Sequence, residues 1–454
     1  MLKFFYQSNR IVCRSTGRLF SSFTGIMSEA IDVKKAEIAL EKQRKKEYKS
    51  RYDGSKKRCN WVTTPPSGTT EEGPEGKKAC LEPFVRIKRK KSVVLLGYAG
   101  KDYYGMQRNP DVKTVEQELL SAMLKHKWIT EEAYNMPQSI AFQRAARTDK
   151  GVSAVRQCVS LKLPLELDVP ALNTDLPKEI RVFAVRTVTQ GFNSKNDCMA
   201  RTYTYTLPTI ALDKDAWKDT AVDTVMEGYR IPREIIEKFG DVLKKYEGTK
   251  NYHNFTIKKE HLDPSAKRYI TSFTTGEPFV VKDVEFMVLK VTGQSFMMHQ
   301  IRKMVGLALS IIRGHENIDM LDKAFTAERI YIPRAPGLGL VLDRLHYDRY
   351  NRRYGNDGIH CPLTWEEFEE EIQQFVREQI YPIITETEIT DKPFLNWLEM
   401  KLSNHNYAGR SMDDQENSED EDEWQDEGKA TKKVTQDVDL PENIVNEEPM
   451  KSVS

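Results

Sequence analysis

Two parts of this chain repeat the same order of predicted elements, and this order restricts the fold more than any other feature of the sequence. Each part combines strand patterns with one helical pattern, in the order of a split α/β unit. The strands are predicted at residues 93–96, 140–145, 157–163 and 180–188, and again at 266–273 and 285–291. We therefore expect an α+β fold in which two ferredoxin-like units join into one largely antiparallel sheet, with helices on one face and a basic cleft between the units.

Both predicted helices have recognisable first residues. Thr114 is a predicted N-cap, and Gln117 completes a capping-box pattern, in which each side chain reaches a backbone N–H of the other residue. In the second unit, the stretch from Gly293 predicts a helix that runs to about Ile312, with a core face along one side. Arg302 falls at the border of that face, where an arginine is usually exposed to solvent.

Asp149 is predicted to lie at the tip of a turn between two strands. A strand-like lead-in from Phe142 breaks at Asp149-Lys150-Gly151, and apolar alternation resumes four residues later. Arg147 precedes the carboxylate by two residues, and Lys150 follows it directly. Aspartate is common in turns because its side chain bonds nearby backbone N–H groups, so the triplet by itself favours a structural role.

The longer stretch Arg147-Thr148-Asp149-Lys150-Gly151-Val152-Ser153-Ala154 closely resembles the signature of the tRNA pseudouridine synthase A family. Agreement extends from about Lys91 to Tyr350, and several segments are similar to the eukaryotic tRNA pseudouridine synthase 1 branch. The resemblance implies that Asp149 is the nucleophile in the isomerisation of uridine to pseudouridine in tRNA. The target nucleotide must then be flipped out of its stem, and the reaction requires no cofactor and no metal.

Five further residues are candidates for the site, and three of them receive their roles through the same resemblance. Tyr203 corresponds to the tyrosine that stacks on the target base and is implicated in removing its C5 proton; without the resemblance it would be a strand tyrosine half in the core. Arg302 corresponds to the arginine that pairs with the nucleophile, and Leu340 to a residue of the uracil pocket. Arg147 is expected to fill the space that the flipped nucleotide leaves or to hold a phosphate, and Lys150 to bind substrate.

The expected partner is tRNA, with other structured RNAs such as messenger RNA as further targets, and the protein is expected to be a monomer or homodimer. Two other functions stay open: a non-catalytic RNA-binding or chaperone protein, and a hydrolase that excises the base. Attack at C1′ of the ribose and attack at C6 of the base are both open. The six cysteines form no C-x-x-C pair, so neither a zinc site nor a disulfide framework is expected.

Charge is distributed unevenly along the chain. The net charge of +1 combines −11 from residue 413 onward with +12 in residues 1–412, and a basic body suits a polyanionic partner. Residues 1–28 have the cationic, acid-free composition of a mitochondrial transit peptide, and Met27 offers an alternative start for a nuclear form. We expect localisation to the nucleus and mitochondrion. No apolar run approaches the roughly eighteen residues of a membrane span, so no membrane association is expected.

These patterns divide the chain into six expected regions. They are a mitochondrial transit-like segment (1–28), a basic disordered linker (29–91), a first catalytic subdomain with the Asp149 loop (92–208), a second catalytic subdomain (209–350), a helical C-terminal extension (351–412) and an acidic disordered tail (413–454). Helical patterns at 365–380 and 394–402 are expected to cover the catalytic core.

Overall fold

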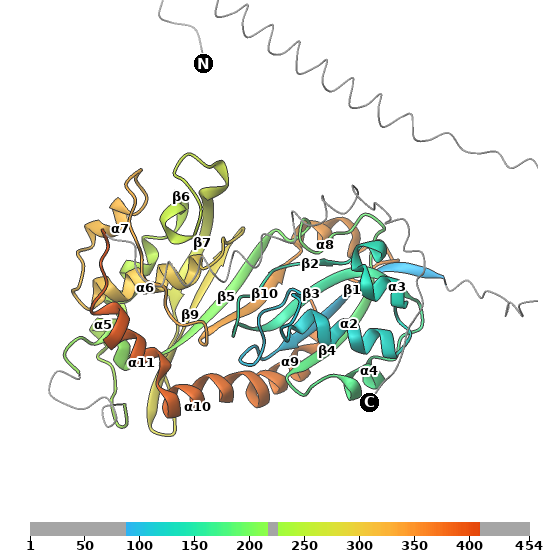
Figure 1. Ribbon diagram of the computed structural model, residues 1–454, viewed down its shortest axis with the longest axis horizontal. Coiled ribbons are helices and arrows are strands. Elements are labelled where there is room, and N and C mark those ends of the chain that lie inside the picture. The colour runs from blue at the N-terminus through green and yellow to red at the C-terminus, as the bar shows by residue number, and fades with distance from the viewer. Residues whose placement is uncertain (1–87, 217–225, 409–454) are drawn as a thin grey trace, which may run out of the picture. The chain divides into compact units, whose positions relative to one another are not determined.

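A computed structural model describes residues 88–216 and 226–408 (Figure 1). The transit-like segment, most of the linker and the acidic tail lie outside the described residues, so the expectations for them stay predictions. No helix in the two described ranges combines the length and the apolar character that crossing a bilayer requires.

One sheet of ten strands forms the centre of the described chain, and its main path runs β4-β1-β3-β10-β5-β9-β7-β6, with β2 beside β3 and β8 beside β9. Among these strands only β3 and β10 pair in parallel. The prediction of an α+β fold with a largely antiparallel sheet is therefore confirmed. The strands are β1 (Arg89–Tyr98), β2 (Gln143–Arg144), β3 (Ser153–Pro164), β4 (Ile180–Thr187), β5 (Ala200–Pro208), β6 (Gly248–Asn251), β7 (Lys267–Thr275), β8 (Phe279–Val281), β9 (Val284–Gly293) and β10 (Leu340–His346).

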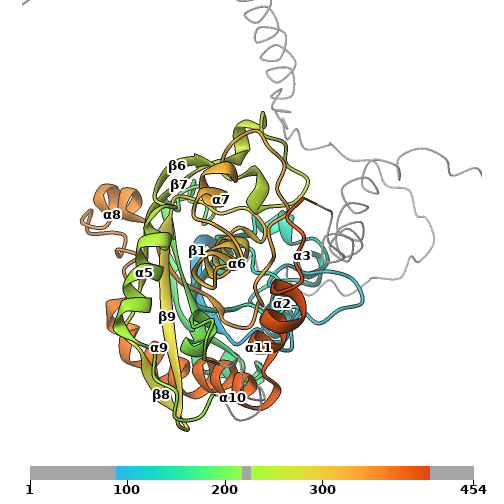
Figure 2. The same ribbon diagram turned by 90° about the vertical axis from the view of Figure 1, so that its left-hand side faces the viewer.

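Helices cover the sheet, and Figure 2 shows α2 and α6 on the same side of it. The helices are α2 (Val115–Lys125), α3 (Glu131–Asn135), α4 (Val169–Asp175), α5 (Arg233–Lys244), α6 (Gln300–Ile312), α7 (Asp319–Lys323), α8 (Asp348–Tyr354), α9 (Glu369–Phe375), α10 (Tyr381–Asp391) and α11 (Pro393–Trp397). A π-helical turn at Val376–Ile380 joins α9 to α10, and a second one, η7 (Leu398–Leu402), follows α11. The helical patterns predicted at 365–380 and 394–402 thus correspond to real helices, whereas α10 was not predicted.

Helix α9, the first helix of the C-terminal extension after α8, covers the face of the sheet opposite to α2. Arg144 of β2 pairs with Glu116 of α2, and Val159 is the neighbour of Arg144 across the β2–β3 pair. Neighbours across a strand pair point to the same face, and side chains three positions apart on a strand point to opposite faces. Arg156 therefore points away from α2, and it binds Glu369 of α9.

Three local predictions were wrong in detail. Thr114 does precede α2, but its hydroxyl is buried without a hydrogen-bond partner in the described chain, and the Gln117 amide donates to the Tyr134 hydroxyl instead of closing a capping box. Helix α6 begins at Gln300 and not near Gly293, because β9 continues to Gly293 and His299 has a left-handed backbone conformation (φ 60°). The strand expected at 140–145 is reduced to the two residues of β2.

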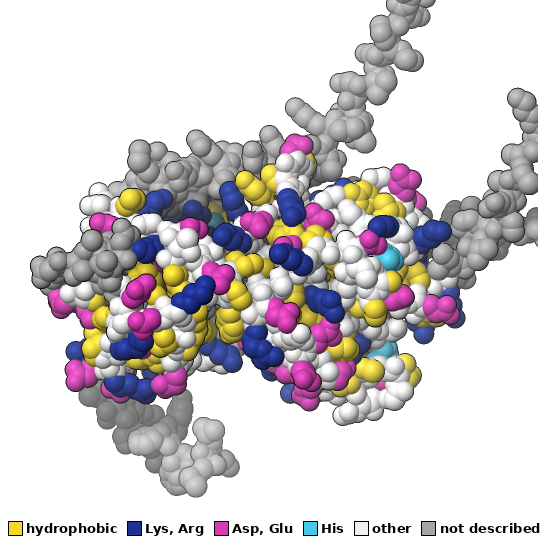
Figure 3. Space-filling model, turned by 90° about the horizontal axis from the view of Figure 1, so that it is seen from below, with side chains coloured by type: hydrophobic (Ala, Val, Ile, Leu, Met, Phe, Trp, Pro, Cys, Tyr) yellow, Lys and Arg dark blue, Asp and Glu magenta, His cyan; other side chains and the backbone are white. Residues whose placement is uncertain are grey.

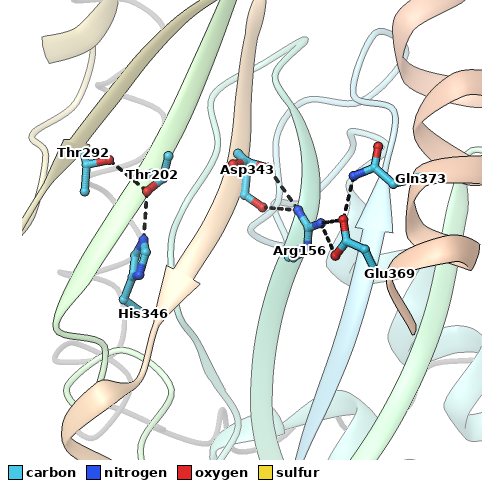
Figure 4. A network of polar contacts seen from close by, with 7 residues as sticks. All are labelled: Arg156, Thr202, Thr292, Asp343, His346, Glu369 and Gln373. Atoms are coloured by element: carbon cyan, nitrogen blue, oxygen red, sulfur yellow. Dashed lines mark hydrogen bonds and ion pairs between the residues drawn. The ribbon is translucent and has the colours of Figure 1, made fainter. Parts of the chain in front are cut away.

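Polar networks connect the middle strands to each other and to α9 (Figure 4). The buried Arg156 guanidinium of β3 donates to the Asp343 carboxylate of β10 at 3.0 Å and to both carboxylate oxygens of Glu369 at 2.7 and 2.8 Å. On the neighbouring strand β5, the Thr202 hydroxyl bonds to Nε2 of His346 at 2.8 Å and also to a threonine of β9. Arg156 is thus the cation that joins both halves of the sheet to the C-terminal helices.

We expect Arg156→Met to lower the free energy of unfolding by about 2 kcal/mol, because the substitution removes a buried cation that bridges two carboxylates. The loss stays moderate because the side chains of Asp343 and Glu369 are 23% and 43% exposed and keep part of their hydration. Urea denaturation measures the change. Arg181→Met is the matched control, since Arg181 forms an exposed ion pair with Glu371 and should lose no more than about 0.5 kcal/mol. Equal losses in the two variants would contradict the bridging role of Arg156.

Candidate active site

The parallel pairing of β3 with β10 brings two loops to one edge of the sheet. Ser153 of β3 lies beside Val341 of β10. Because the two strands run in the same direction, the loops that precede them lie at the same edge. One of these loops carries Asp149, and the other carries residues 334–337.

Backbone and side-chain contacts fix the turn that carries Asp149. The Thr148 hydroxyl forms a hydrogen bond with the buried Tyr98 hydroxyl at 2.8 Å, and the Gln157 side-chain amide donates to the carbonyl of Ala146 at 2.9 Å. Gly105 packs directly against the same turn with φ +87°, and a Cβ atom at this position would lie 2.5 Å from the Thr148 carbonyl oxygen. The turn therefore requires glycine at position 105, and it holds Asp149 on a rigid support between β2 and β3.

Two guanidinium groups act on the Asp149 carboxylate, whose side chain is 27% exposed. Burial raises the pKa of Asp149, and the positive charges of Arg302 and Arg334 lower it. The Asp149 Oδ2 atom lies 3.7 Å from Nδ1 of His299. Burial and the same two arginines hold the pKa of His299 well below its usual range, so this imidazole is neutral at physiological pH. The carboxylate is therefore stabilised by arginine charges and not by an imidazolium.

Arg302 is held beside the Asp149 loop by the segment that precedes β10. The Arg302 Nε–H donates to the carbonyl of Ala335 at 2.7 Å, and the backbone N–H of Ala335 donates to the carbonyl of Arg302 at 3.2 Å. A Cβ atom at Gly337 would lie 3.6 Å from Cζ of Arg302 and 3.3 Å from the carbonyl oxygen of Lys150. Gly337 therefore lies where these two groups converge, and a Cβ atom there would be tight only against the Lys150 carbonyl oxygen.

The structure places the aromatic and apolar residues predicted for the site on β5 and β10. Tyr203 is buried and lies edge-on to Phe296, with 5.2 Å between the ring centroids. Burial raises the pKa of the Tyr203 phenol, and the negative charge of Asp149 raises it further. Leu340 is the buried first residue of β10. Tyr203 and Arg302 are thus each close enough to Asp149 to interact with its charge.

The two remaining predicted residues lie on the solvent side of the turn. The side chains of Arg147 and Lys150 are both exposed. The Lys150 ammonium lies 4.1 Å from the ring centroid of Tyr104, which is itself 45% exposed. Arg147 and Lys150 therefore present positive charge at the entrance to the site, and they do not touch the carboxylate of Asp149.

The sequence interpretation missed His299 and Arg334. His299 stands three residues before Arg302, so its nearness to a predicted site residue was a usable signal. Arg334 precedes Ala335-Pro336-Gly337 and carries no local signal, because only the packing of this loop against α6 brings it to Asp149. Its guanidinium lies 3.3 Å from the His299 ring nitrogens. No cluster of three or more His, Cys, Asp or Glu side chains suited to a metal ion occurs in residues 88–216 and 226–408.

We expect the pKa of Asp149 to lie above the ordinary value of about 3.8. It should rise further in Arg302→Ala, because Arg302 lowers this pKa more than Arg334 does. Carbon-13 NMR of the side-chain carboxyl carbons, in protein labelled at its aspartates, measures the titration, and Asp149→Asn assigns the signal. Arg302→Lys is the matched control, since it keeps the charge and should shift the pKa less than Arg302→Ala. A lower pKa in Arg302→Ala would show that Arg302 does not stabilise the carboxylate.

Comparisons with known proteins identify the family to which this chain belongs. A family model described as tRNA pseudouridine synthase matches residues 242–348, a range that contains Arg302 and Leu340. The mouse protein named Pseudouridylate synthase 1 homolog is 45% identical over 335 residues, which cover 73% of this chain and 78% of the mouse protein. The human protein of the same name is 46% identical over 324 residues, with 70% and 74% covered. The tRNA pseudouridine synthase 1 of the yeast Kluyveromyces lactis is 32% identical over 384 residues, with 68% and 69% covered. This chain therefore belongs to the tRNA pseudouridine synthase family.

Proposed function

We propose that this protein isomerises uridine to pseudouridine in tRNA and that Asp149 is its nucleophile. The observation that carries the proposal is the position of the Asp149 carboxylate, half-buried at the sheet edge in the field of Arg302 and Arg334. A protein that only binds RNA gains nothing from such a carboxylate, because its negative charge repels phosphates. A nucleophile, in contrast, must stay ionised in a pocket that excludes water.

The reaction needs few groups from the protein. The bond between N1 of uracil and C1′ of ribose breaks, the base turns, a bond forms between C5 and C1′, and the C5 proton is lost while N1 gains one. The reactant and product are isomers, so no electrons are exchanged with a second substrate. A carboxylate can form the covalent intermediate by attack at C1′ or at C6, and both routes are consistent with the position of Asp149.

The arginines supply the charge that keeps Asp149 reactive. A base that enters the site removes water from the carboxylate, which raises the cost of its negative charge. Arg302 and Arg334 offset that cost, because ion pairs strengthen as water leaves the site. His299 stays neutral and lies near both the Arg334 guanidinium and the Asp149 carboxylate, so it adds no competing charge.

The remaining predicted residues contact the flipped nucleotide. Tyr203 and Leu340 offer an aromatic ring and an apolar side chain for the base, and stacking on an aromatic ring is worth about 1–3 kcal/mol per base. The raised pKa of Tyr203 keeps its phenol protonated at neutral pH, so its ground state favours stacking over removal of the C5 proton. The exposed Arg147 and Lys150 bind phosphates, and Arg147 also fills the space that the flipped nucleotide leaves.

We expect the protein to release tritium from tRNA labelled at C5 of uridine while the base is retained, and Asp149→Ala to reduce this release on the order of a thousandfold or more, since the covalent step is lost. Asp241→Ala, at an exposed aspartate on α5, is the control and should keep full activity. Free uracil in place of retained base would indicate a hydrolase. The absence of both tritium release and free uracil would indicate a non-catalytic RNA-binding protein.

Arg302→Ala should lower the turnover of saturating tRNA by about tenfold or more, whereas the Kd for tRNA should change by a smaller factor than the turnover. One pKa unit at Asp149 corresponds to a factor of ten in the ionised fraction. Activity requires the ionised carboxylate, so the rate falls as the pH drops through the pKa of Asp149. Loss of Arg302 raises that pKa and moves the acid limb of the profile to higher pH. Single-turnover rates across pH 5 to 9 measure both effects, and a near-normal rate would refute the pairing role.

We also propose a localisation, a further class of RNA substrate and an oligomeric state for this protein. Residues 1–28 would direct a long form to the mitochondrion, and a form started at Met27 would enter the nucleus. The composition of the first 28 residues supports this proposal. Structured messenger RNA as an additional substrate, and a monomeric or homodimeric state, are proposals of the same kind.

A further inference from the structure

A cavity of about 320 Å³ lies where the C-terminal helices meet the active-site arginines. This volume is within the range of pockets that hold small ligands. Three separate parts of the chain contribute to its wall: α6, the loop before β10, and the segment formed by α11 and η7. The lining residues are Arg302, Arg334, Pro336, Pro393, Asn396, Trp397, Met400 and Lys401.

The lining of this cavity is suited to an anion. It contains two arginines, one lysine and one asparagine, and none of its eight residues is acidic. The side chain of Trp397, which is 93% buried, forms an apolar part of the wall and leaves the recognition of an anion to these four residues. By contrast, Figure 3 shows Lys and Arg interspersed with Asp and Glu over the underside of the molecule, the side on which α10 lies in Figure 1.

One aromatic side chain holds two walls of the cavity together. The Tyr205 hydroxyl donates to the carbonyl of Pro336 at 2.7 Å, and the Tyr205 ring packs against Phe394 of α11 with 6.2 Å between centroids. The Glu388 carboxylate accepts the backbone N–H of Phe394, which fixes the start of α11. The cavity is therefore built by packed and hydrogen-bonded elements, and it does not depend on a loose surface loop.

Arg302 and Arg334 connect the cavity to the nucleophile. Both line the cavity, and both act on the charge of Asp149. A uridine that reaches Asp149 brings a phosphate on each side of its ribose, and at least one must lie close to these arginines. Guanidinium groups bind phosphate oxygens in two-pronged hydrogen bonds, and a lysine adds a point charge.

We propose that this cavity is an RNA phosphate subsite, completed by α11 and η7, which holds the backbone phosphate next to the flipped uridine. The inference rests on the proposed function, since it takes RNA as the ligand. It assigns the C-terminal segment a direct part in substrate binding through Lys401 and Asn396. These two residues position the RNA and leave the covalent chemistry to Asp149.

The test uses the full chain with Lys401→Ala and Asn396→Ala, because the first removes a charge and the second removes a neutral polar side chain. The Kd for tRNA is measured at several salt concentrations. Lys401→Ala should raise the Kd about threefold to tenfold and reduce the slope of log Kd against log salt by about 0.7. Asn396→Ala should raise the Kd about twofold to threefold without changing that slope. At subsaturating tRNA, the single-turnover rate of each variant should fall by about the factor by which its Kd rises.

Lys244→Ala is the matched control, because Lys244 is exposed on α5 and does not line the cavity. A change in salt slope for Lys401→Ala no larger than that for Lys244→Ala would overturn the subsite. Tighter tRNA binding by Lys401→Ala would also overturn it and would indicate that the cavity holds an acidic segment of this chain. Both outcomes leave the proposed function intact if the variants still release tritium. Thermal unfolding of Lys401→Ala confirms that the comparison is made between folded proteins.

Discussion

The parallel pairing of β3 with β10 is the contact on which the arrangement of the site depends. It consists of two register pairs, Ser153 with Val341 and Ala154 with Leu342. An antiparallel contact would have sent the two preceding loops to opposite edges of the sheet, far from each other. The ion pair between Arg156 and Asp343 lies just beyond this short contact and strengthens it. A few central residues thus determine whether Asp149 and the 334–337 loop can meet at all.

Once the loops meet, burial and charge oppose each other at Asp149. Burial disfavours the charged form of the carboxylate, and the two guanidinium groups favour it. The same guanidinium groups keep His299 neutral, so the local positive charge comes from arginines, whose charge does not titrate in the physiological range. The reciprocal hydrogen bonds between Arg302 and Ala335 hold in place the guanidinium that lowers the pKa of Asp149 most. The charge balance of the site therefore depends on a loop-to-helix contact as much as on the Asp149 carboxylate.

The C-terminal segment, which follows the range that the family model matches (it ends at residue 348), also contacts the sheet and the site. Figure 1 shows α10 running from the side of α9 toward α11. Along its length, Thr387 accepts a hydrogen bond from Lys101 of the loop after β1, and Glu386 pairs with Lys282 at the β8–β9 turn. The segment thereby contacts both halves of the sheet before α11 reaches the arginines of the site.

The local sequence determined much of this protein. The Asp-Lys-Gly triplet placed Asp149 in a turn, the alternating stretch around Tyr203 formed β5, and the resemblance carried by residues 147–154 identified the family. These features depend on backbone preferences and side-chain periodicity within a few residues, which a sequence displays directly. Tertiary structure alone decided the rest. Gln117 left its expected capping box for Tyr134, a partner 17 residues away, and Arg334 and Trp397 joined the site through packing between segments that are distant in the chain. Such contacts depend on strand order and loop direction, and no local pattern encodes either of them.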